Sequence, residues 1–562
     1  MVCDRGAYTT LKQRLLCGGS VFRWSVALGI GAGMALAGAP AAKAFNLYSG
    51  TVSGNDLEIN LNTTVEYSNI FRVNSPSKVL TSDVNANDGD LNFQHGLVDN
   101  TFDALPVFDL KYGNYGAHVS GEFYLDTPYL GKSQNDSPST YNAYTVGSNR
   151  DFTSATRNVN GENAILLDAF AYGTQYFGDG GSQSVTVKVG RQTLMWGQSL
   201  YFAGNGIAAG QAPIDVIKAL NLPNAQAQQI FLPVGQVAAT YSAGPNFSVQ
   251  GYYQFEWEPD TLEGVGSYFS TSDIVGPGAQ RLMVGQGYGY PPSAVNIYRV
   301  KDLRPPIDNG QFGLAVQGTV GKFDLGLYAL RYDDHAPEGI YTGAAQPGKG
   351  PGNVASYWIV YPRDIQIYGA ALSTVTNSGV QISGEVSGRR NMPLVSAAAP
   401  GSSFPGSANA GALYPVGSTV AAQISSIYIT PGIPLDPGGI TFSGEAAMNH
   451  VVSVQKNQAL LEPGRNQTAA AFQFTVSPTY DNLLPDLDLS FPIGFKYNFL
   501  GRSMIDTTMN HGTGFFNLGV AATYRTVWNA ALTYQDYIGK ADPTLNPYAD
   551  RGYVEFSVQR TF

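Results

Sequence analysis

Charged residues are scarce in this chain: they make up 13% of its 562 residues, against about a quarter in ordinary soluble proteins. Cysteine is nearly absent, since the chain contains only Cys3 and Cys17. Beyond the N-terminal region, no apolar run approaches the ~18 residues that a membrane-spanning helix needs. These shortages exclude a helical membrane protein and a domain stapled by disulfides.

The N-terminus has the pattern of a secretory signal peptide. Basic residues precede an Ala/Gly-rich apolar run from Val26 to Ala39, and Ala42-Lys43-Ala44 fits a cleavage site. We predict that residues 1–44 are removed and that 45–562 form one domain. Both cysteines leave with the signal, which excludes thiolate metal sites and suits an oxidising compartment.

The mature chain is acidic. Removal of the signal takes away five of the 32 basic residues and one of the 42 acidic ones, which leaves a net charge of about −14. Such a charge argues against nucleic acid as a partner and against a polybasic membrane anchor. The five histidines are scattered, and no cofactor motif is present, so neither a metal cluster nor a cofactor is expected.

Alternation of apolar and polar residues is the main signal in the rest of the chain. In the last stretch, 550–562, Val554, Phe556 and Phe562 share one parity, and polar residues occupy most of the other. Arg560 departs from the pattern because it shares the apolar parity. A terminal strand of this kind, with 66 glycines and 34 tyrosines, is typical of an outer-membrane β-barrel. The alternative is a large secreted all-β protein, a β-helix or a propeller.

Tight turns rich in Gly and Asn divide the chain into strand pairs. The turns lie at 113–116, 178–181, 244–246, 321–322, 377–379 and 437–439. Reading outward from them predicts about eighteen strands (16–18) of an antiparallel transmembrane barrel, wide enough to enclose a channel. The predicted strands are 56–71, 104–113, 116–130, 161–178, 184–196, 233–243, 246–258, 309–320, 322–334, 361–375, 379–390, 419–432, 439–454, 467–480, 485–499, 514–524, 526–538 and 550–562.

The faces of these strands are predicted from their parity. Apolar residues such as Tyr67 on the first strand and Phe247, Phe255 and Trp257 on the seventh are expected to face lipid, with polar residues facing inward. A soluble barrel would have the opposite polarity. The short turns would face the periplasm, and the long connections (72–103, 131–160, 197–232, 259–308, 335–360 and 391–418) would face the outside.

Two long connections are too apolar to be exposed at a cell surface. The connection 197–232 is rich in large apolar residues, among them Ile207, Ile217 and Phe231, and its stretch Pro213–Leu220 suits two helical turns with proline near the start. We expect 197–232 and part of 259–308 to fold into the lumen.

A Ser-Gly-Glu motif recurs at one depth and ends at Glu122, Glu385 and Glu445. Each motif begins four residues after a turn glycine, so the three carboxylates should point inward at a similar height. They would either form a layer that sets charge selectivity or hold the structure together by pairing with Arg or Lys from neighbouring strands. The structural role is the more common one for carboxylates inside barrels.

A second group of lumen or constriction candidates surrounds Gly190-Arg191-Gln192 and Trp196. Parity would place Arg191 toward lipid, so we predict a bulge at Gly190 that turns Arg191 inward, with Asp168 as its partner. Trp196 belongs to the same least generic stretch of the chain. The remaining candidates are Glu256 and Arg389, the latter as a positive charge across from Glu385.

Motifs for chemistry are weak. Asp83, Asn85, Asn87, Asp88 and Asp90 resemble the start of a calcium loop, but the glycine falls one position late and Gln94 replaces the terminal glutamate. No serine-hydrolase elbow or zinc-protease motif is present, so no catalytic residue is predicted and the protein is not expected to be an enzyme.

Several motifs together resemble a family of proteobacterial outer-membrane proteins catalogued as a domain of unknown function. They are Asp88 to Phe93, Tyr112 to Gly116, Asp126 with Tyr129, Gly190 to Gln192 with Trp196 to Gln198, Leu232-Pro233, Tyr252 to Gln254 and Gly266 to Phe269. The resemblance covers the mature chain, with Gln198 where glutamate is commoner. It implies an outer-membrane barrel often found with a periplasmic lipoprotein-like partner and an inner-membrane exporter of the resistance-nodulation type, in settings that commonly involve hydrophobic compounds such as steroids, aromatic acids or lipids.

The resulting hypothesis is an outer-membrane channel for small organic, hydrophobic or amphipathic molecules. Its surroundings would be outer-membrane lipids and lipopolysaccharide. One alternative is a scaffold without transport that receives lipid from a periplasmic carrier, and another is an outer-membrane lipase.

Overall fold

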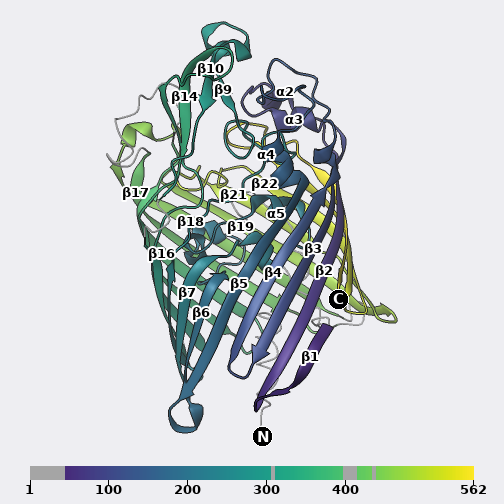
Figure 1. The fold of residues 1–562 in the computed structure, drawn as a ribbon, viewed down its shortest axis with the longest axis vertical. Helices are drawn as coiled ribbons and strands as arrows, with labels where there is room; N and C mark the ends of the chain where they lie inside the picture. Colours follow the sequence, from purple (N-terminus) through teal and green to yellow (C-terminus); the bar gives the residue numbers. More distant parts are fainter. Residues whose placement is uncertain (1–44, 306–309, 397–413, 433–437) are drawn as a thin grey trace.

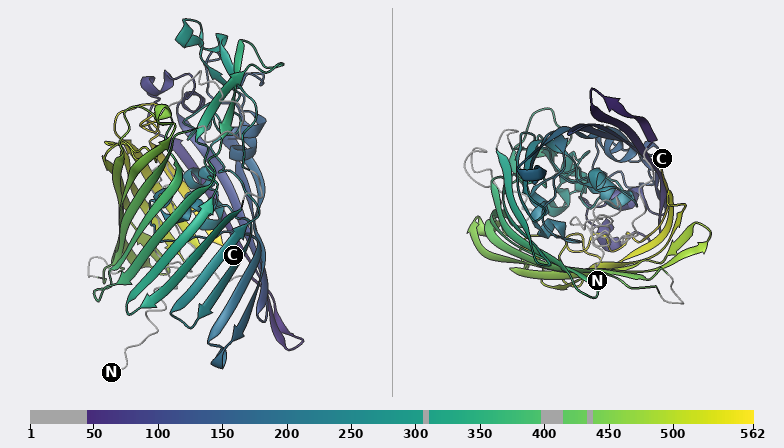
Figure 2. Two further views of the ribbon diagram at one scale, coloured as in Figure 1. Left: turned by 90° about the vertical axis from the view of Figure 1, so that its left-hand side faces the viewer. Right: turned by 90° about the horizontal axis from the view of Figure 1, so that it is seen from below.

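Eighteen antiparallel strands form a closed barrel, as predicted (Figures 1 and 2). The computed structural model describes residues 45–562 apart from 306–309, 397–413 and 433–437, so the predicted signal peptide lies outside the described residues. The wall strands are β2 (Asn55–Arg72), β3 (Gly96–Tyr112), β4 (Tyr115–Asp126), β5 (Glu162–Phe177), β6 (Gln183–Gln192), β7 (Val234–Ala243), β8 (Phe247–Gln254), β11 (Gln311–Val320), β12 (Phe323–Tyr332), β15 (Ile365–Val375), β16 (Gln381–Pro393), β17 (Val416–Ile429), β18 (Ile440–Lys456), β19 (Thr468–Leu484), β20 (Leu487–Ser490) with β21 (Ile493–Leu500), β22 (Gly514–Tyr524), β23 (Trp528–Ile538) and β24 (Tyr553–Thr561).

Each wall strand pairs with the next, and β24 closes the ring against β2 from Thr64 to Arg72. β20 and β21 together form one wall strand, because both lie between β19 and β22. Pro492 lies at the break between them, and proline has no N–H for a ladder hydrogen bond.

One strand was missed in the sequence. β1 (Phe45–Val52) pairs with Asn55–Leu61 of β2, beyond the point where the terminal Phe562 meets Thr63. A two-residue turn joins them, in which Ser53 and Gly54 have φ of 50° and 83°. This turn geometry matches the twist of a hairpin. β1 therefore satisfies the backbone groups of β2 that β24 is too short to reach.

The exterior is apolar and the interior polar. On β2, Tyr67 is 45% exposed, whereas its neighbours Glu66 and Ser68 are 2% and 0% exposed. Arg560 does lie on the outward parity, but its guanidinium lies 4.9 Å from the ring centre of Trp528 and 4.2 Å from that of Phe562. Two aromatic faces thus stabilise this cation at the short-turn rim.

The prediction that Trp257 faces lipid is wrong. β8 ends at Gln254, and Trp257 is buried beyond the wall, where its ring stacks on His335 and meets Tyr361 edge-on. The alternating pattern continues past the end of the strand by chance. None of the helices in the described part of the chain is long and apolar enough to cross a membrane.

A small second sheet stands above the long-loop end of the barrel (Figure 1). It lies in connections that were predicted as loops, and its order is β13 (Gly339–Ala344), β14 (Asn353–Val360), β10 (Asn296–Arg299), β9 (Arg281–Met283). The short helices are α2 (Lys78–Thr81), α3 (Asp88–Asn92), η1 (Thr127–Leu130), α4 (Ser154–Thr156), η2 (Arg157–Gly161), η3 (Asp179–Gly181), η4 (Ala203–Asn205), η5 (Ile207–Gly210), α5 (Val216–Asn221), α6 (Ala227–Ile230), η6 (Gly285–Tyr288), η7 (Pro292–Ala294) and η8 (Gln458–Leu460).

Candidate functional site

The connection between β6 and β7 lies inside the barrel, as predicted. We call residues 193–233 the plug segment; it carries η4, η5, α5 and α6 and is buried over most of its length. Viewed along the barrel, its helices lie within the ring of strands (Figure 2). The wall of the barrel holds two parts of the plug segment in different ways. We call residues 196–207 the backbone-held half and residues 213–231 the helical half.

Two of the three Ser-Gly-Glu carboxylates hold the backbone-held half through its main chain. Glu385 on β16 accepts hydrogen bonds from the N–H groups of Gln198 (2.7 Å) and Ile207 (2.6 Å). Glu445 on β18 accepts three, from Leu200 (3.0 Å), Tyr201 and Phe202 (2.8 Å). Charge-assisted bonds of this kind are about twice as strong as neutral ones.

Other predicted residues hold the same half. Arg389 donates to the carbonyl oxygens of Gly204 (3.2 Å) and Gly206 (2.7 Å), so it binds the plug segment rather than facing open lumen. Trp196 packs against Tyr252, and its indole N–H donates to Gln250 on β8 at 3.0 Å. The residue that follows Trp196 must be a glycine, because the backbone there packs closely against Glu385.

Gly197 shows that requirement directly. Its φ is +96°, and a Cβ there would lie 2.2 Å from Oε2 of Glu385. Only glycine combines this backbone conformation with so close an approach of a carboxylate.

The third carboxylate holds the helical half through side chains. Glu122 on β4 lies 3.4 Å from the Nζ of Lys218 on α5 and accepts a 2.7 Å hydrogen bond from Gln229 on α6. Gln229 also donates to Asp103 on β3 at 3.0 Å. Lys218 is only 2% exposed, and its Nζ lies over the ring of Tyr124. The helical half is thus tied to β3 and β4, on strands distant from β16 and β18.

The helical half also contacts the seam where the barrel closes. Asn224 donates to Glu66 on β2 at 3.1 Å and to Ser557 on β24 at 3.2 Å. Gln559 on β24 donates to the other oxygen of Glu66 at 3.0 Å. The plug segment therefore joins β2 and β24 as well as spanning the lumen.

An apolar cluster covers the helical half from the long-loop end. The cluster consists of buried apolar residues: Ile70, Phe93, Val98, Tyr129, Phe152, Ala203, Ala212, Val216, Ala219, Leu220, Leu222, Ala225, Ile230, Phe231, Tyr268, Phe269, Tyr548 and Tyr553.

Asp215 caps α5 by accepting a hydrogen bond from the N–H of Lys218 at 3.0 Å. Burial raises the pKa of Asp215 to about 7, although Lys218 opposes the shift.

Three of the motifs that carried the family resemblance meet in this cover: Asp88 to Phe93, Tyr129 and Gly266 to Phe269. Gly89 lies so close to the segment Gly266–Phe269 that a Cβ would be 2.5 Å from the carbonyl oxygen of Ser267. Asn92 donates to the carbonyl of Gly266 at 2.8 Å. Tyr129 accepts a hydrogen bond from the N–H of Tyr268 at 3.1 Å. These motifs build one packing unit above the plug segment.

The calcium interpretation of the same stretch is not supported. Asp90 forms ion pairs with Arg72 (2.8 Å) and Arg551 (3.0 Å), and Asp88 accepts a hydrogen bond from the N–H of Asn142 (2.8 Å). The other three side chains make separate contacts: Asp83 with the N–H of Asn85, Asn85 with Met283, and Asn87 with Thr81. No group of three or more His, Cys, Asp or Glu side chains that could hold a metal ion occurs among the described residues.

The prediction for Arg191 is wrong in two respects. The ladders on both sides of β6 keep a regular register through Gly190, so no bulge is present and Arg191 keeps the parity of exposed Val189. Its partner is Glu256, not Asp168, and it also donates to the carbonyl of Pro233 at 2.9 Å. Arg191 and Glu256 therefore fasten the rim of β6 to the chain beyond β8 instead of lining the lumen.

Asp168 has a local role. Its carboxylate accepts a hydrogen bond from Ser120 on β4 at 3.3 Å, and its backbone N–H donates to the same hydroxyl at 3.0 Å.

Sequence reasoning missed Lys218, Asn224 and Gln229 on the plug segment. A signal for Lys218 did exist, because one cation within an apolar stretch destined for the interior needs an acidic partner.

The fold and the tethered segment define an outer-membrane-type β-barrel with an internal plug. The model of the family described as "Protein of unknown function (DUF1302)" matches residues 25–562, and the chain belongs to this family. No curated protein matches the chain.

Solved structures of porins are similar at low identity. OccAB4 of Acinetobacter baumannii is 8% identical with a TM-score of 0.44, and 90% of this chain and 98% of that chain are covered. A BenF-like porin from Pseudomonas fluorescens Pf-5 is 11% identical with a TM-score of 0.41, covering 90% and 98%. OpdK of Pseudomonas aeruginosa, solved with vanillate, is 10% identical with a TM-score of 0.38, covering 89% and 98%.

Proposed function

We propose that this protein is a non-enzymatic outer-membrane channel for small organic molecules of hydrophobic or amphipathic character. The observation that carries the proposal is the plug segment: one connection crosses the lumen and is tied to β3 and β4 on one side and to β16 and β18 on the other. A barrel of this strand number can enclose a channel, and a tethered internal segment narrows it.

In this proposal the acidic layer supports the plug segment and does not set charge selectivity. Glu122, Glu385 and Glu445 each bind the plug segment, so their charges are engaged by it. Passage would then depend on the space beside the plug segment, where weak contacts allow both entry and release.

The test is conductance of the purified protein in planar bilayers, compared with the variant E385A/E445A. Loss of both acceptors frees five backbone N–H groups, so we expect larger and noisier openings than in the wild type. E58Q, which removes a carboxylate of β2 outside the plug contacts, is the matched control and should behave like the wild type. If neither the wild type nor E385A/E445A gave channel openings, the result would contradict the channel and favour a scaffold.

Partners are part of the same proposal. The family resemblance suggests a periplasmic lipoprotein-like carrier and an inner-membrane exporter. Photo-crosslinking residues at the short turns, for example at Asn114 and Asp179, should capture the carrier, whereas the same residues at long-loop positions should not. Fatty acid released from lipid by the detergent-solubilised protein would contradict the absence of enzyme activity.

A further inference from the structure

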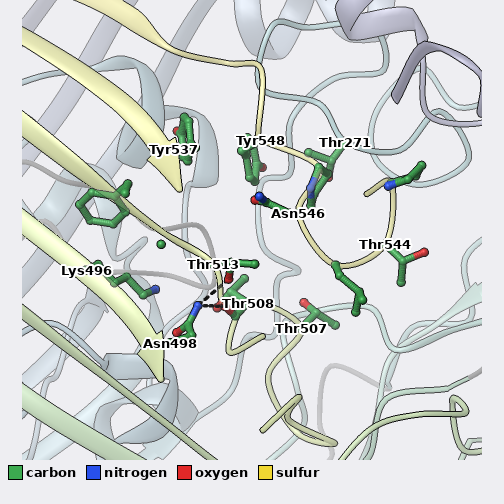
Figure 3. A pocket seen from close by; sticks show the side chains of 15 residues that line it. Thr271, Lys496, Asn498, Thr507, Thr508, Thr513, Tyr537, Thr544, Asn546 and Tyr548 are labelled. Atoms are coloured by element: carbon green, nitrogen blue, oxygen red, sulfur yellow. Dashed lines mark hydrogen bonds between the residues drawn. The ribbon is translucent and has the colours of Figure 1, made fainter. Parts of the chain in front are cut away.

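A cavity of about 250 Å³ lies at the inner face of β21, β22 and β23, below the connections 501–513 and 539–552 (Figure 3). Three of its residues form a row at one height across the strands, because Lys496 pairs with Phe515 and Phe515 pairs with Tyr537. Lys496 borders the plug segment, since its Nζ lies 5.4 Å from the ring centre of Phe202. The cavity therefore lies beside the backbone-held half.

Lys496 is the unusual member of this row. The residue is 2% exposed, and within the described part of the chain its ammonium makes no ion pair and no hydrogen bond. Asp506, in the connection above, accepts two hydrogen bonds from Thr508 with one oxygen, at 2.8 and 2.7 Å, and is not paired with Lys496. Asp506 attracts the charge of Lys496 without forming an ion pair with it. A buried cation with no counter-ion in contact is costly, which points to an anion as its missing partner.

The other walls select for an organic anion. The hydroxyl of Tyr537 accepts a hydrogen bond from Gln535 at 3.1 Å, which leaves its hydrogen free to donate. Tyr537 stacks on Tyr548 with ring centres 5.6 Å apart, and Phe515 supplies another aromatic surface. One cation and one hydroxyl donor thus stand beside three aromatic rings.

We propose that this cavity binds the carboxylate of a small amphipathic acid. The ammonium of Lys496 and the hydroxyl of Tyr537 receive the carboxylate, and an apolar ring lies against Phe515 and Tyr548. A cavity of about 150 Å³ holds benzene, so this one has room for a ring with a carboxylate. The inference rests on the proposed function, because it names a class of molecule that would meet the wall beside the plug segment.

Isothermal titration of the full detergent-solubilised protein with benzoate tests the site. Benzamide, which has nearly the same shape without the charge, is the ligand control. We expect benzoate to bind in the millimolar range or tighter and benzamide at least tenfold more weakly. K496Q should weaken benzoate at least tenfold, K496R should retain binding within a few fold, and K540Q, at an exposed lysine of the neighbouring connection, should match the wild type.

A second variant keeps the site testable if K496Q does not fold. T544W places a large ring into the cavity from the connection 539–552 and leaves Lys496 unchanged, so it should also abolish benzoate binding. Equal binding of benzoate and benzamide, or unchanged binding in K496Q or T544W, would overturn the site. Because titration does not depend on conductance, an open channel without benzoate binding refutes only the site. Binding by a protein that never conducts refutes only the channel.

Discussion

The two halves of the plug segment are held by different chemistry. The backbone-held half gives its main-chain N–H groups to Glu385 and Glu445, so the barrel wall provides the specific side chains. The helical half gives its own side chains, Lys218, Asn224 and Gln229, to the wall and buries an apolar cluster under the outer connections.

This difference predicts where each half is vulnerable. The backbone-held half depends on Glu385, Glu445 and Arg389 of the wall, and its own buried side chains add contacts, such as the 2.6 Å hydrogen bond between the hydroxyl groups of Tyr201 and Ser443. The helical half depends on its own sequence. Hydrogen exchange of backbone amides, followed by mass spectrometry on peptides from 196–207 and 213–231, measures the opening of each half separately.

The largest expected effect is that of K218M on the helical half. The variant removes the cation that lies beside Glu122 in a buried setting, and breaking such a pair costs about 3–5 kcal/mol. Exchange in 213–231 should therefore rise more than a hundredfold, whereas exchange in 196–207 should stay within a few fold of the wild type. The double variant K218M/E122Q should recover part of the loss, because residue 122 then carries no unpaired charge, whereas the buried carboxylate of Asp103 remains.

E445A is the converse test and should have the next largest effect. It leaves the N–H groups of Leu200, Tyr201 and Phe202 without their acceptor, but the shorter alanine side chain opens space for water to bind them, so we expect a total cost of about 1–3 kcal/mol. Exchange in 196–207 should rise by at least tenfold and exchange in 213–231 should not change. If both halves open together in K218M and in E445A, the plug segment is one cooperative unit and the comparison fails.

The wall could be predicted from sequence because its signals are local. Parity, turn glycines and the inverted polarity of strands such as β2 each depend on neighbouring residues. β1 was missed because its role arises from a mismatch in length between β2 and β24, which no local pattern records. The inward position of the plug segment was predictable from its apolar content.

The contacts of the plug segment could not be predicted in the same way. Glu122, Glu385 and Glu445 were recognised as a layer, but Glu385 and Glu445 accept hydrogen bonds from backbone N–H groups. Every residue except proline has such a group, so no side chain in the distant sequence marks their partners. The Arg191 prediction failed for a related reason, since Asp168 only adjoins Ala169, the ladder partner of Arg191, whereas Glu256 reaches Arg191 from beyond the end of β8.

The two halves should also differ in how their stability against local opening depends on pH. Because burial raises the pKa of Asp215 to about 7, the folded helical half holds a proton that the opened segment releases above about pH 4. Stability of the helical half therefore falls as pH rises from about 4 to 7, by at most about 1.4 kcal/mol per pH unit. After correction for intrinsic exchange rates, protection of 213–231 should be greater at pH 5 than at pH 7. D215N keeps an N-cap acceptor and should reduce this slope.

The smallest effect is expected for W196F, which changes a side chain within the backbone-held half. Phenylalanine still packs on Tyr252, and the N–H of residue 196 keeps its 2.6 Å hydrogen bond to Gln211, but the indole bond to Gln250 is lost. A cost of about 1 kcal/mol follows for one neutral hydrogen bond, which corresponds to a rise of several fold in exchange over 196–207. Q250L, which removes the acceptor from the wall instead, should give a rise of similar size. A much larger effect of W196F than of E445A would show that side-chain packing, and not the wall carboxylates, holds this half, because the main-chain bonds to Glu385 and Glu445 are intact in W196F.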